Sequence, residues 1–166
     1  MLDKEAAAQG WPRWPKSDDL AYCKPAASSS VSPWSWSQDP RRDACGANGE
    51  WLADDYGFHT QEEPDPWWMV DLLDEYNIEK VTIVNRHSQS QRFSTFRIES
   101  SLDANIWTTR FTQTEPKAIS SDPDSPWKAH FSKPFPARYV RIVLLGVGML
   151  HLRRVQIFAV RQGRRW

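Results

Sequence analysis

The fold of this chain is decided by the sequence Trp-Trp-Met-Val-Asp-Leu-Leu at residues 67–73. Every side chain in it except Asp71 is apolar, which is the pattern of a strand buried in a protein core. Residues 78–85 follow with aliphatic and polar side chains interspersed. We therefore predict two strands in this part of the chain, one at 67–73 and one at 78–85.

The C-terminal half continues in the same way. Its patterns predict strands at residues 93–101, 107–111, 127–131, 138–145 and 152–160, with a turn at Gly146-Val147-Gly148 between the last two. Strands that follow one another at roughly 8–15 residues, with almost no helical period, are typical of antiparallel sandwiches. We predict an all-β fold, an antiparallel β-sandwich of the jelly-roll type.

The N-terminal third is less regular. Residues 20–26 look like a first strand, and Pro33 in the Ser-rich stretch that follows favours an edge or loop position. Residues 39–57 lack periodicity and predict one long ordered loop, a kind of segment that often carries function. This gives three parts: an arm or linker at 1–19, the sandwich at 20–160 and a short basic tail at 161–166.

The composition of the 166-residue chain suits one well-buried domain. With 21 basic and 21 acidic residues, the net charge gives no long-range field that would attract nucleic acid or an anionic membrane. No apolar run approaches the ~20 residues that span a bilayer, and the N-terminus lacks the apolar core of a signal peptide. The chain is then either intracellular or a module of a larger protein, and we favour the module. Cys23 and Cys45 are two free thiols or one disulfide.

Several short motifs between residues 20 and 160 carry a resemblance to a known family. The chain resembles the discoidin superfamily, the coagulation factor V/VIII C-type domains, which are galactose-binding-like jelly rolls. The motifs are Lys24-Pro25-Ala26 with Ser28-Ser29, the strand at 67–72, Ser101 and Asp103 ahead of Trp107, Arg138-Tyr139-Val140-Arg141-Ile142, and the closing residues 152–157. The resemblance implies an extracellular or cell-surface module.

Within that superfamily the chain is most similar to the fucolectins, the fucose-binding F-type lectins. Their motif is a His, twenty-six residues, an Arg, an acidic residue two positions later and a second basic residue seven after the Arg. His59 and Arg86 match this spacing, whereas Ser88 stands in place of the acidic residue and Arg92 lies six residues after Arg86. The resemblance therefore implies a sugar site formed by His59, Arg86 and Arg92.

These residue types suit a sugar ligand for chemical reasons. An arginine fork can hold two neighbouring hydroxyl oxygens, a histidine nitrogen can add a third contact, and an aromatic ring can cover the apolar face of a pyranose. Tyr56 and Trp36 are the predicted aromatic partners, with Phe58 and Trp34 as further candidates. Structural roles stay open: a loop cap for His59, and for Arg86 an ion pair with Asp71, Glu62 or Glu63.

The fucolectin resemblance also implies a structural calcium ion, held by loop carbonyls, an Asp-Gly aspartate and a glutamate that begins the last strand. Here Asn48-Gly49 takes the place of Asp-Gly, and Arg154 stands near the position of the glutamate. Calcium sites normally include carboxylates. We therefore predict no metal ligands and no cofactor, and we expect the Arg154 guanidinium to take the ion's place.

The sequence predicts a binding module. The chain has no G-x-S-x-G, H-E-x-x-H or P-loop pattern, and we predict that it is not an enzyme. The leading hypothesis is a lectin-like module that recognises a terminal sugar of a glycan or glycoconjugate, fucose or galactose, through His59, Arg86 and Arg92. The alternative is a protein- or membrane-docking module of a larger protein, with Trp34 and Trp36 as exposed membrane contacts and no functional sugar site.

Overall fold

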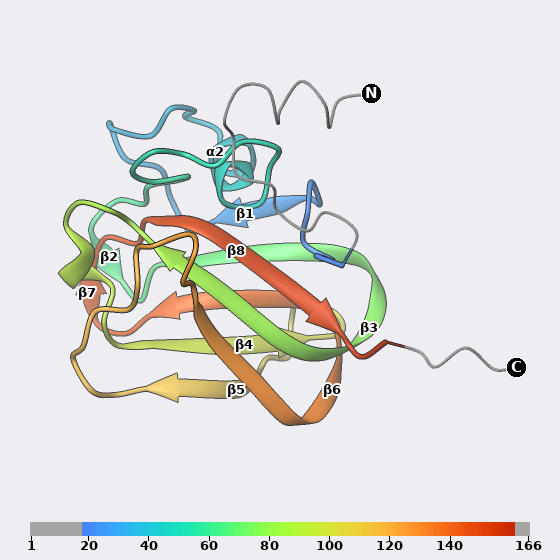
Figure 1. Ribbon diagram of the computed structural model, residues 1–166. Coiled ribbons are helices and arrows are strands. Elements are labelled where there is room, and N and C mark those ends of the chain that lie inside the picture. The colour runs from blue at the N-terminus through green and yellow to red at the C-terminus, as the bar shows by residue number, and fades with distance from the viewer. Residues whose placement is uncertain (1–17, 162–166) are drawn as a thin grey trace, which may run out of the picture.

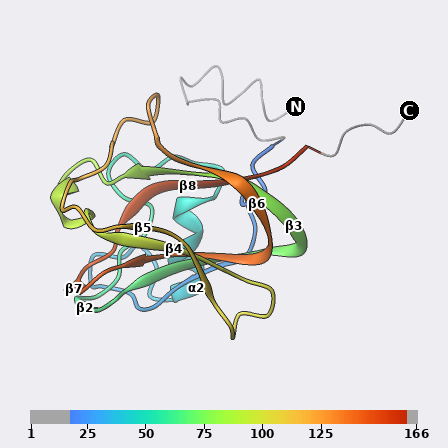
Figure 2. The ribbon, with the colours of Figure 1, turned by 90° about the horizontal axis from the view of Figure 1, so that it is seen from below.

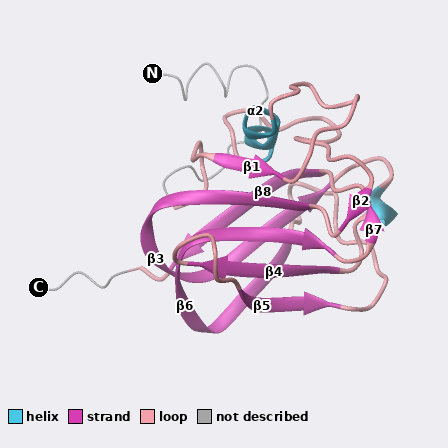
Figure 3. Ribbon diagram, turned by 180° about the vertical axis from the view of Figure 1, so that it is seen from behind, coloured by secondary structure: helices cyan, strands magenta, loops and turns pink. Residues whose placement is uncertain are grey.

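A computed structural model of the protein describes residues 18–161. The predicted arm at 1–19 and tail at 161–166 lie almost entirely outside the described residues. Strands dominate the described part (Figures 1 and 3), and its elements are β1 (Ala26–Ser28), α2 (Pro40–Ala44), the 3-10 turn η1 (Cys45–Ala47), β2 (Glu63–Pro64), β3 (Trp67–Asn85), the 3-10 turn η2 (Ser90–Arg92), β4 (Phe96–Ser101), β5 (Thr108–Gln113), β6 (Trp127–Leu144), β7 (Val147–Gly148) and β8 (Leu152–Ala159). No helix within residues 18–161 is long and apolar enough to cross a bilayer.

Two long bent strands, β3 and β6, join the two layers of the sandwich. The first part of β3, residues 67–71, pairs antiparallel with residues 139–143 of β6, and β1 and β4 flank this pair. The second part of β3 pairs with the first part of β6 and with β8. Seen from below, β4 and β5 lie in one layer and β8 in the other, and β3 and β6 curve between them (Figure 2).

The sequence predicts these bent strands as four separate ones, at 67–73, 78–85, 127–131 and 138–145, and on this point it is wrong. Residues 73–75 at the bend of β3 are exposed. The sequence around them therefore resembles a loop, although the strand continues through them. Register shifts accompany the bend, and Leu73 takes a left-handed backbone with φ of 67°. The predicted strand at 20–26 is also wrong, since residues 20–23 form turns and β1 begins at Ala26.

The core lies between the two layers and is built from large apolar side chains. Trp68, Val70 and Leu72 alternate along one face of β3 and are fully buried. They join buried aliphatic residues of β6 and β8 and the stacked pair Phe93 and Phe96, whose ring centroids are 4.4 Å apart. Alternation of this kind, with one face of each layer buried, is what holds a sandwich together.

Residues 29–62 form a loop layer that covers one end of the sandwich. α2 and η1 lie in this layer, inside the stretch that the sequence predicts as an ordered loop (Figure 1). The layer is tied to the core by Trp68, whose Nε1 donates to the carbonyl oxygen of Ala44 at 2.9 Å. Gly46 and Gly57 cross so closely that a Cβ on Gly46 would lie 1.8 Å from the Gly57 oxygen, so this crossing requires glycine. Cys23 and Cys45 are both free thiols.

Candidate functional site

The predicted site residues all lie in loops at the end of the sandwich that the loop layer covers. Trp36, Tyr56 and His59 belong to that layer, Arg86 directly follows β3, and Arg92 ends η2. Asn85, the last residue of β3, pairs with Leu152, the first residue of β8, so the loops that adjoin these two strand ends lie next to each other. The topology thus gathers residues that lie far apart in the sequence.

His59 is buried, with 2% of its surface exposed, and its orientation is fixed on both sides. Its backbone N–H donates to Asp43 Oδ2 at 3.0 Å, and its Nδ1 lies 2.8 Å from the Thr60 carbonyl oxygen. Because a carbonyl only accepts, Nδ1 carries the proton and Nε2 presents a lone pair. Nε2 lies 3.4 Å from Arg86 Nη1. Burial and the charges of Arg86 and Arg92 lower the pKa of His59, which keeps the ring neutral.

Arg86 is held by three different groups. Its Nε donates to Asp55 Oδ2 and to Ser88 Oγ, both at 3.1 Å, and its guanidinium lies 4.6 Å from the centre of the Tyr56 ring. Tyr56 also packs edge-on against His59, with ring centroids 5.2 Å apart. Within residues 18–161 no hydrogen bond reaches Nη2 of Arg86. The arrangement presents oriented donors beside a histidine acceptor.

Asp55 is a member of this site that the sequence did not single out. Its Oδ1 accepts from the backbone N–H of Ser88 and its Oδ2 from the Ser88 hydroxyl, both at 2.7 Å. Partial burial raises the pKa of Asp55, but the hydrogen bonds from Ser88 and the charge of Arg86 outweigh it, so the net shift is downward. Asp55 therefore supplies the carboxylate beside Arg86 that the sequence appeared to lack at Ser88. Of the alternative partners for Arg86, Asp71 pairs with Arg138 instead.

Arg92, Trp34 and Trp36 lie in the loops near this centre. Arg92 Nη1 is 3.7 Å from Met149 Sδ, and Arg92 borders a cavity of about 340 Å³ that Glu62 and Val147 also line. The ring of Trp34 is 5.8 Å from that of His59, and 62% of Trp34 is exposed. Trp36 is 71% exposed, and its Nε1 donates to the Gly57 oxygen at 2.8 Å. The structure thus brings His59, Arg86 and Tyr56 into contact and leaves Arg92 and Trp36 at the rim.

His151 is a second residue that the sequence analysis missed. It is fully buried, its ring centroid is 5.0 Å from that of His59, and neither ring nitrogen has a hydrogen-bond partner within the described part of the chain. Burial, together with the charges of Arg86 and His59, lowers its pKa to about 3. A neutral histidine therefore backs the His59 ring, and nothing in its local sequence marks it.

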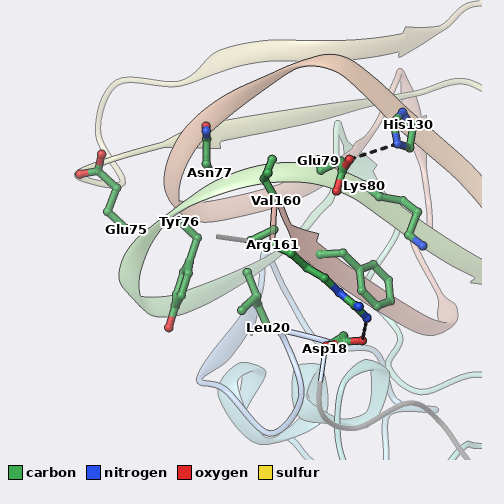
Figure 4. Close-up of a pocket in the computed structure, with 12 residues that line it drawn as sticks. Asp18, Leu20, Glu75, Tyr76, Asn77, Glu79, Lys80, His130, Val160 and Arg161 are labelled. Carbon is green, nitrogen blue, oxygen red and sulfur yellow. Dashed lines mark hydrogen bonds and ion pairs between the residues drawn. The ribbon is translucent and has the colours of Figure 1, made fainter. Parts of the chain in front are cut away.

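A larger cleft, of about 1080 Å³, lies at the bend of β3 and the C-terminal end of β8 (Figure 4). Four of the side chains that line it form two pairs: Arg161 with Asp18 at 2.9 Å, and His130 with Glu79 at 3.5 Å. None of the predicted site residues lines it. Both ion pairs are exposed, so they hold the cleft only weakly.

The family of the chain follows from comparison with known proteins. The F5/8 type C domain model matches residues 25–153. The chain belongs to this family. Fucolectin-1 of Anguilla japonica is 34% identical over 106 residues, which is 61% of this chain and 57% of that protein. This F5/8 type C domain therefore spans little more than half the length of that relative.

Solved structures agree with this placement. The lectin domain of lectinolysin, complexed with Lewis B antigen, is 26% identical with a TM-score of 0.66 and covers 88% of this chain and 99% of its own. A Streptococcus pneumoniae fucose binding module is 26% identical with a TM-score of 0.65, covering 86% and 98%. The fucolectin of striped bass, Morone saxatilis, is 21% identical with a TM-score of 0.70, covers 87% and 49%, and shows the fold alone. The predicted antiparallel β-sandwich and the discoidin resemblance are confirmed. These relatives are binding modules rather than catalytic domains.

The residues of this F5/8 type C domain do not fit the calcium ion that the resemblance implies. Where a carboxylate ligand is expected, the Arg154 guanidinium donates to the carbonyl oxygens of Gly49 and Trp51, at 2.7 and 2.9 Å. Within residues 18–161 no three His, Cys, Asp or Glu side chains come together in a way that could hold a metal ion. A buried cation at this position would repel a second one.

Proposed function

We propose that this F5/8 type C domain is a lectin-like carbohydrate-binding module that recognises a terminal sugar of a glycan or glycoconjugate. The observation that carries the proposal is the contact of the His59 Nε2 lone pair with an Arg86 whose direction Asp55 and Tyr56 fix. An arginine held in a fixed direction presents oriented N–H donors, which suit the oxygens of neighbouring sugar hydroxyls. The eel fucolectin, the lectinolysin lectin domain and the pneumococcal fucose binding module support this proposal.

Each site residue has a role in this proposal. Arg86 donates from Nη2 to a sugar hydroxyl, the neutral His59 helps to orient the guanidinium through the contact of Nε2 with Nη1, and Arg92 supplies a further donor. Tyr56, Trp34 and Trp36 supply aromatic surface for the apolar face of the sugar, as aromatic rings commonly do. The sugar is fucose or galactose. Because Arg92 follows Arg86 by six residues instead of seven, its donors are displaced relative to the fucolectin pattern, and a glycan array distinguishes the two sugars.

The decisive experiment is Arg86→Ala with Arg138→Ala as its matched control. Both arginines pair with an aspartate and lie against a tyrosine ring, but Arg138 lies on β6 near the bend of β3, with Nε 2.9 Å from Asp71 Oδ1. Loss of charged hydrogen bonds predicts that Arg86→Ala weakens glycan binding about 100-fold or more, while its melting temperature stays close to that of the control. Array binding that survives in Arg86→Ala would reject this site.

A docking role has one observation in its favour. Trp34 and Trp36 are 62% and 71% exposed and project from the loop layer, as apolar contacts to a membrane surface would. Liposomes with anionic lipid separate the two functions. Co-sedimentation that is lost in a Trp34→Ala, Trp36→Ala double variant and unaffected by Arg86→Ala would favour membrane docking, whereas absence of co-sedimentation leaves the sugar site as the function.

A further inference from the structure

The segment at residues 48–57 delivers Asp55 and Tyr56 to the proposed site, and it contains almost no regular structure. Several of its carbonyl groups face β8. The carbonyl oxygens of Gly49 and Trp51 accept from Arg154, and that of Ala53 accepts from Arg153 Nε at 3.0 Å. Arg153 Nη1 also reaches the carbonyl oxygen of Ser121 at 3.0 Å. This loop has no strand pairing of its own, and two consecutive arginines of β8 hold its backbone carbonyl groups by hydrogen bonds.

Arg154 is deeply buried for a charged side chain, with 2% of its surface exposed. Buried charges persist only when other groups compensate them. Here the carbonyls of Gly49 and Trp51 accept its protons, and the charge of Asp19 acts on it electrostatically. Asp19 is itself oriented, since its Oδ1 accepts from the backbone N–H groups of Ala21 and Ile157, both at 3.0 Å. The guanidinium therefore sits at the centre of a prepared set of oxygen acceptors.

Asn48 completes this arrangement from the other side. Its Nδ2 donates to the backbone carbonyl oxygens of Ala21 and Lys24 at 2.7 and 3.0 Å, and the Asn48 backbone carbonyl oxygen accepts from the Cys23 N–H at 2.8 Å. An aspartate at position 48 could not donate these bonds. The amide and the guanidinium together donate to four backbone carbonyl oxygens, those of Ala21, Lys24, Gly49 and Trp51.

We propose that Arg154, assisted by Arg153 and Asn48, replaces the structural calcium ion, so that the loop at 48–57 is assembled without metal. The consequence for the sugar site, that glycan binding is independent of calcium, rests on the proposed function. The stability part of the proposal stands without any sugar. A fixed side-chain cation cannot dissociate, so neither calcium nor a chelator alters the loop.

The first test measures the wild-type domain after exhaustive dialysis against EGTA. We expect the same melting temperature in EGTA and in millimolar CaCl₂, and no heat of calcium binding by titration calorimetry. A calcium-dependent rise in melting temperature, or calorimetric binding of CaCl₂, would overturn the proposal. Neither readout uses a glycan, so failure of the sugar site leaves this result unaffected.

The second test removes the internal cation. Arg154→Gln should lower the melting temperature by about 5 °C or more, because it deletes buried charge-assisted bonds and leaves Asp19 uncompensated. Arg138→Gln, at a partly exposed ion pair, is the control and should change it little. Equal melting temperatures for the two variants would contradict the role of Arg154.

The third test restores the residues that calcium prefers. In the double variant Asn48→Asp, Arg154→Glu we expect a melting temperature that rises with CaCl₂ and falls with EGTA. A folded double variant that does not respond to calcium would contradict the replacement. Since both changes fall in a buried cluster, the wild-type chelator measurement and Arg154→Gln decide the proposal if the double variant does not fold.

Discussion

The sandwich and the loop layer bury very different side chains. In the sandwich the buried groups are mainly apolar, as with Trp68, Ile98 and Ile142, whereas at the loop-covered end they include His59, Asp43, Asn48, His151 and Arg154. The hydrophobic free energy of burial is non-directional and roughly proportional to the apolar area buried, so a core tolerates apolar substitutions of similar volume. A buried polar group needs one particular partner, and its loss costs far more than its contact gains. One region supplies stability and the other supplies chemistry.

The largest effect is expected in the sandwich, from Trp68→Ala. Its side chain is fully buried and stacks on Phe58, with ring centroids 6.4 Å apart. Truncation should lower the free energy of unfolding by about 3–5 kcal/mol, measured by urea titration. Trp67→Ala, on the half-buried opposite face of the same strand, is the control and should cost clearly less. Equal losses of unfolding free energy in the two variants would show that the Trp68 face of β3 contributes no more to the core than the Trp67 face.

The next effect tests the buried histidines through pH. The pKa of His151 is about 3 in the folded domain, below the ordinary value of 6.5, so between these values the unfolded chain binds more protons and stability falls as pH falls. His151→Phe removes this loss. Relative to the wild type, the variant should gain up to about 1.4 kcal/mol for each pH unit below 6.5.

Urea titrations of both proteins at pH 7.5, 6.0 and 5.0 measure this difference. Burial raises the pKa of Asp19 to about 6, which favours folding at low pH, but this contribution is present in both proteins and cancels. His59, whose pKa is also lowered, cancels likewise. A difference that does not vary with pH would place the His151 ring in contact with water.

A smaller effect, on binding rather than folding, is expected from Asp55→Ala. Arg86 then loses its Nε partner and its fixed direction, and glycan affinity should drop about 10-fold, with little change in melting temperature. Adding Ser88→Asp to this variant puts a carboxylate at the spacing of the fucolectin motif and should restore most of the affinity. Calorimetric titration of both variants checks this. No recovery in the double variant would mean that Asp55 does more than orient Arg86.

The smallest effect is expected at the rim. Trp36→Ala should lower glycan affinity by about 3- to 10-fold, as loss of one aromatic contact does, and should leave the unfolding free energy within about 0.5 kcal/mol. Trp34→Ala is the comparison, since its ring lies 5.8 Å from His59. If neither change affects affinity, the aromatic face of the sugar site is Tyr56 alone.

The sequence predicted the apolar strands well and their connections less well. The predicted strand at 67–73 lies in β3, and those at 138–145 and 152–160 are confirmed up to Leu144 and Ala159, because apolar patterning is local and is visible in a window of a few residues. The bends of β3 and β6 were lost because exposed polar residues at a bend resemble a loop. Each of these strands is continuous because β3 and β6 pair with each other on both sides of the bend.

The site shows the same division. The motif spacing predicts His59 and Arg86 as site residues, and in the structure Arg86 Nη1 lies 3.4 Å from His59 Nε2. Asp55 was one loop carboxylate among several, and Ser88 suggested that the acidic partner was absent. Only the packing of residues 48–57 against the end of β3 shows that Asp55 supplies it.

Periodicity and motif spacing are properties of the chain, so the sequence was enough to predict the β-sandwich, its family and the first two residues of the proposed binding site. The tertiary structure shows which polar groups meet: Asp55 reaches Arg86, and His151 backs His59. It also shows that Arg154, which the sequence analysis already singled out, donates to the carbonyls of Gly49 and Trp51. The physical reason is range: hydrophobic patterning acts along neighbouring residues, whereas a buried charge is stable only beside partners that folding brings from elsewhere in the chain.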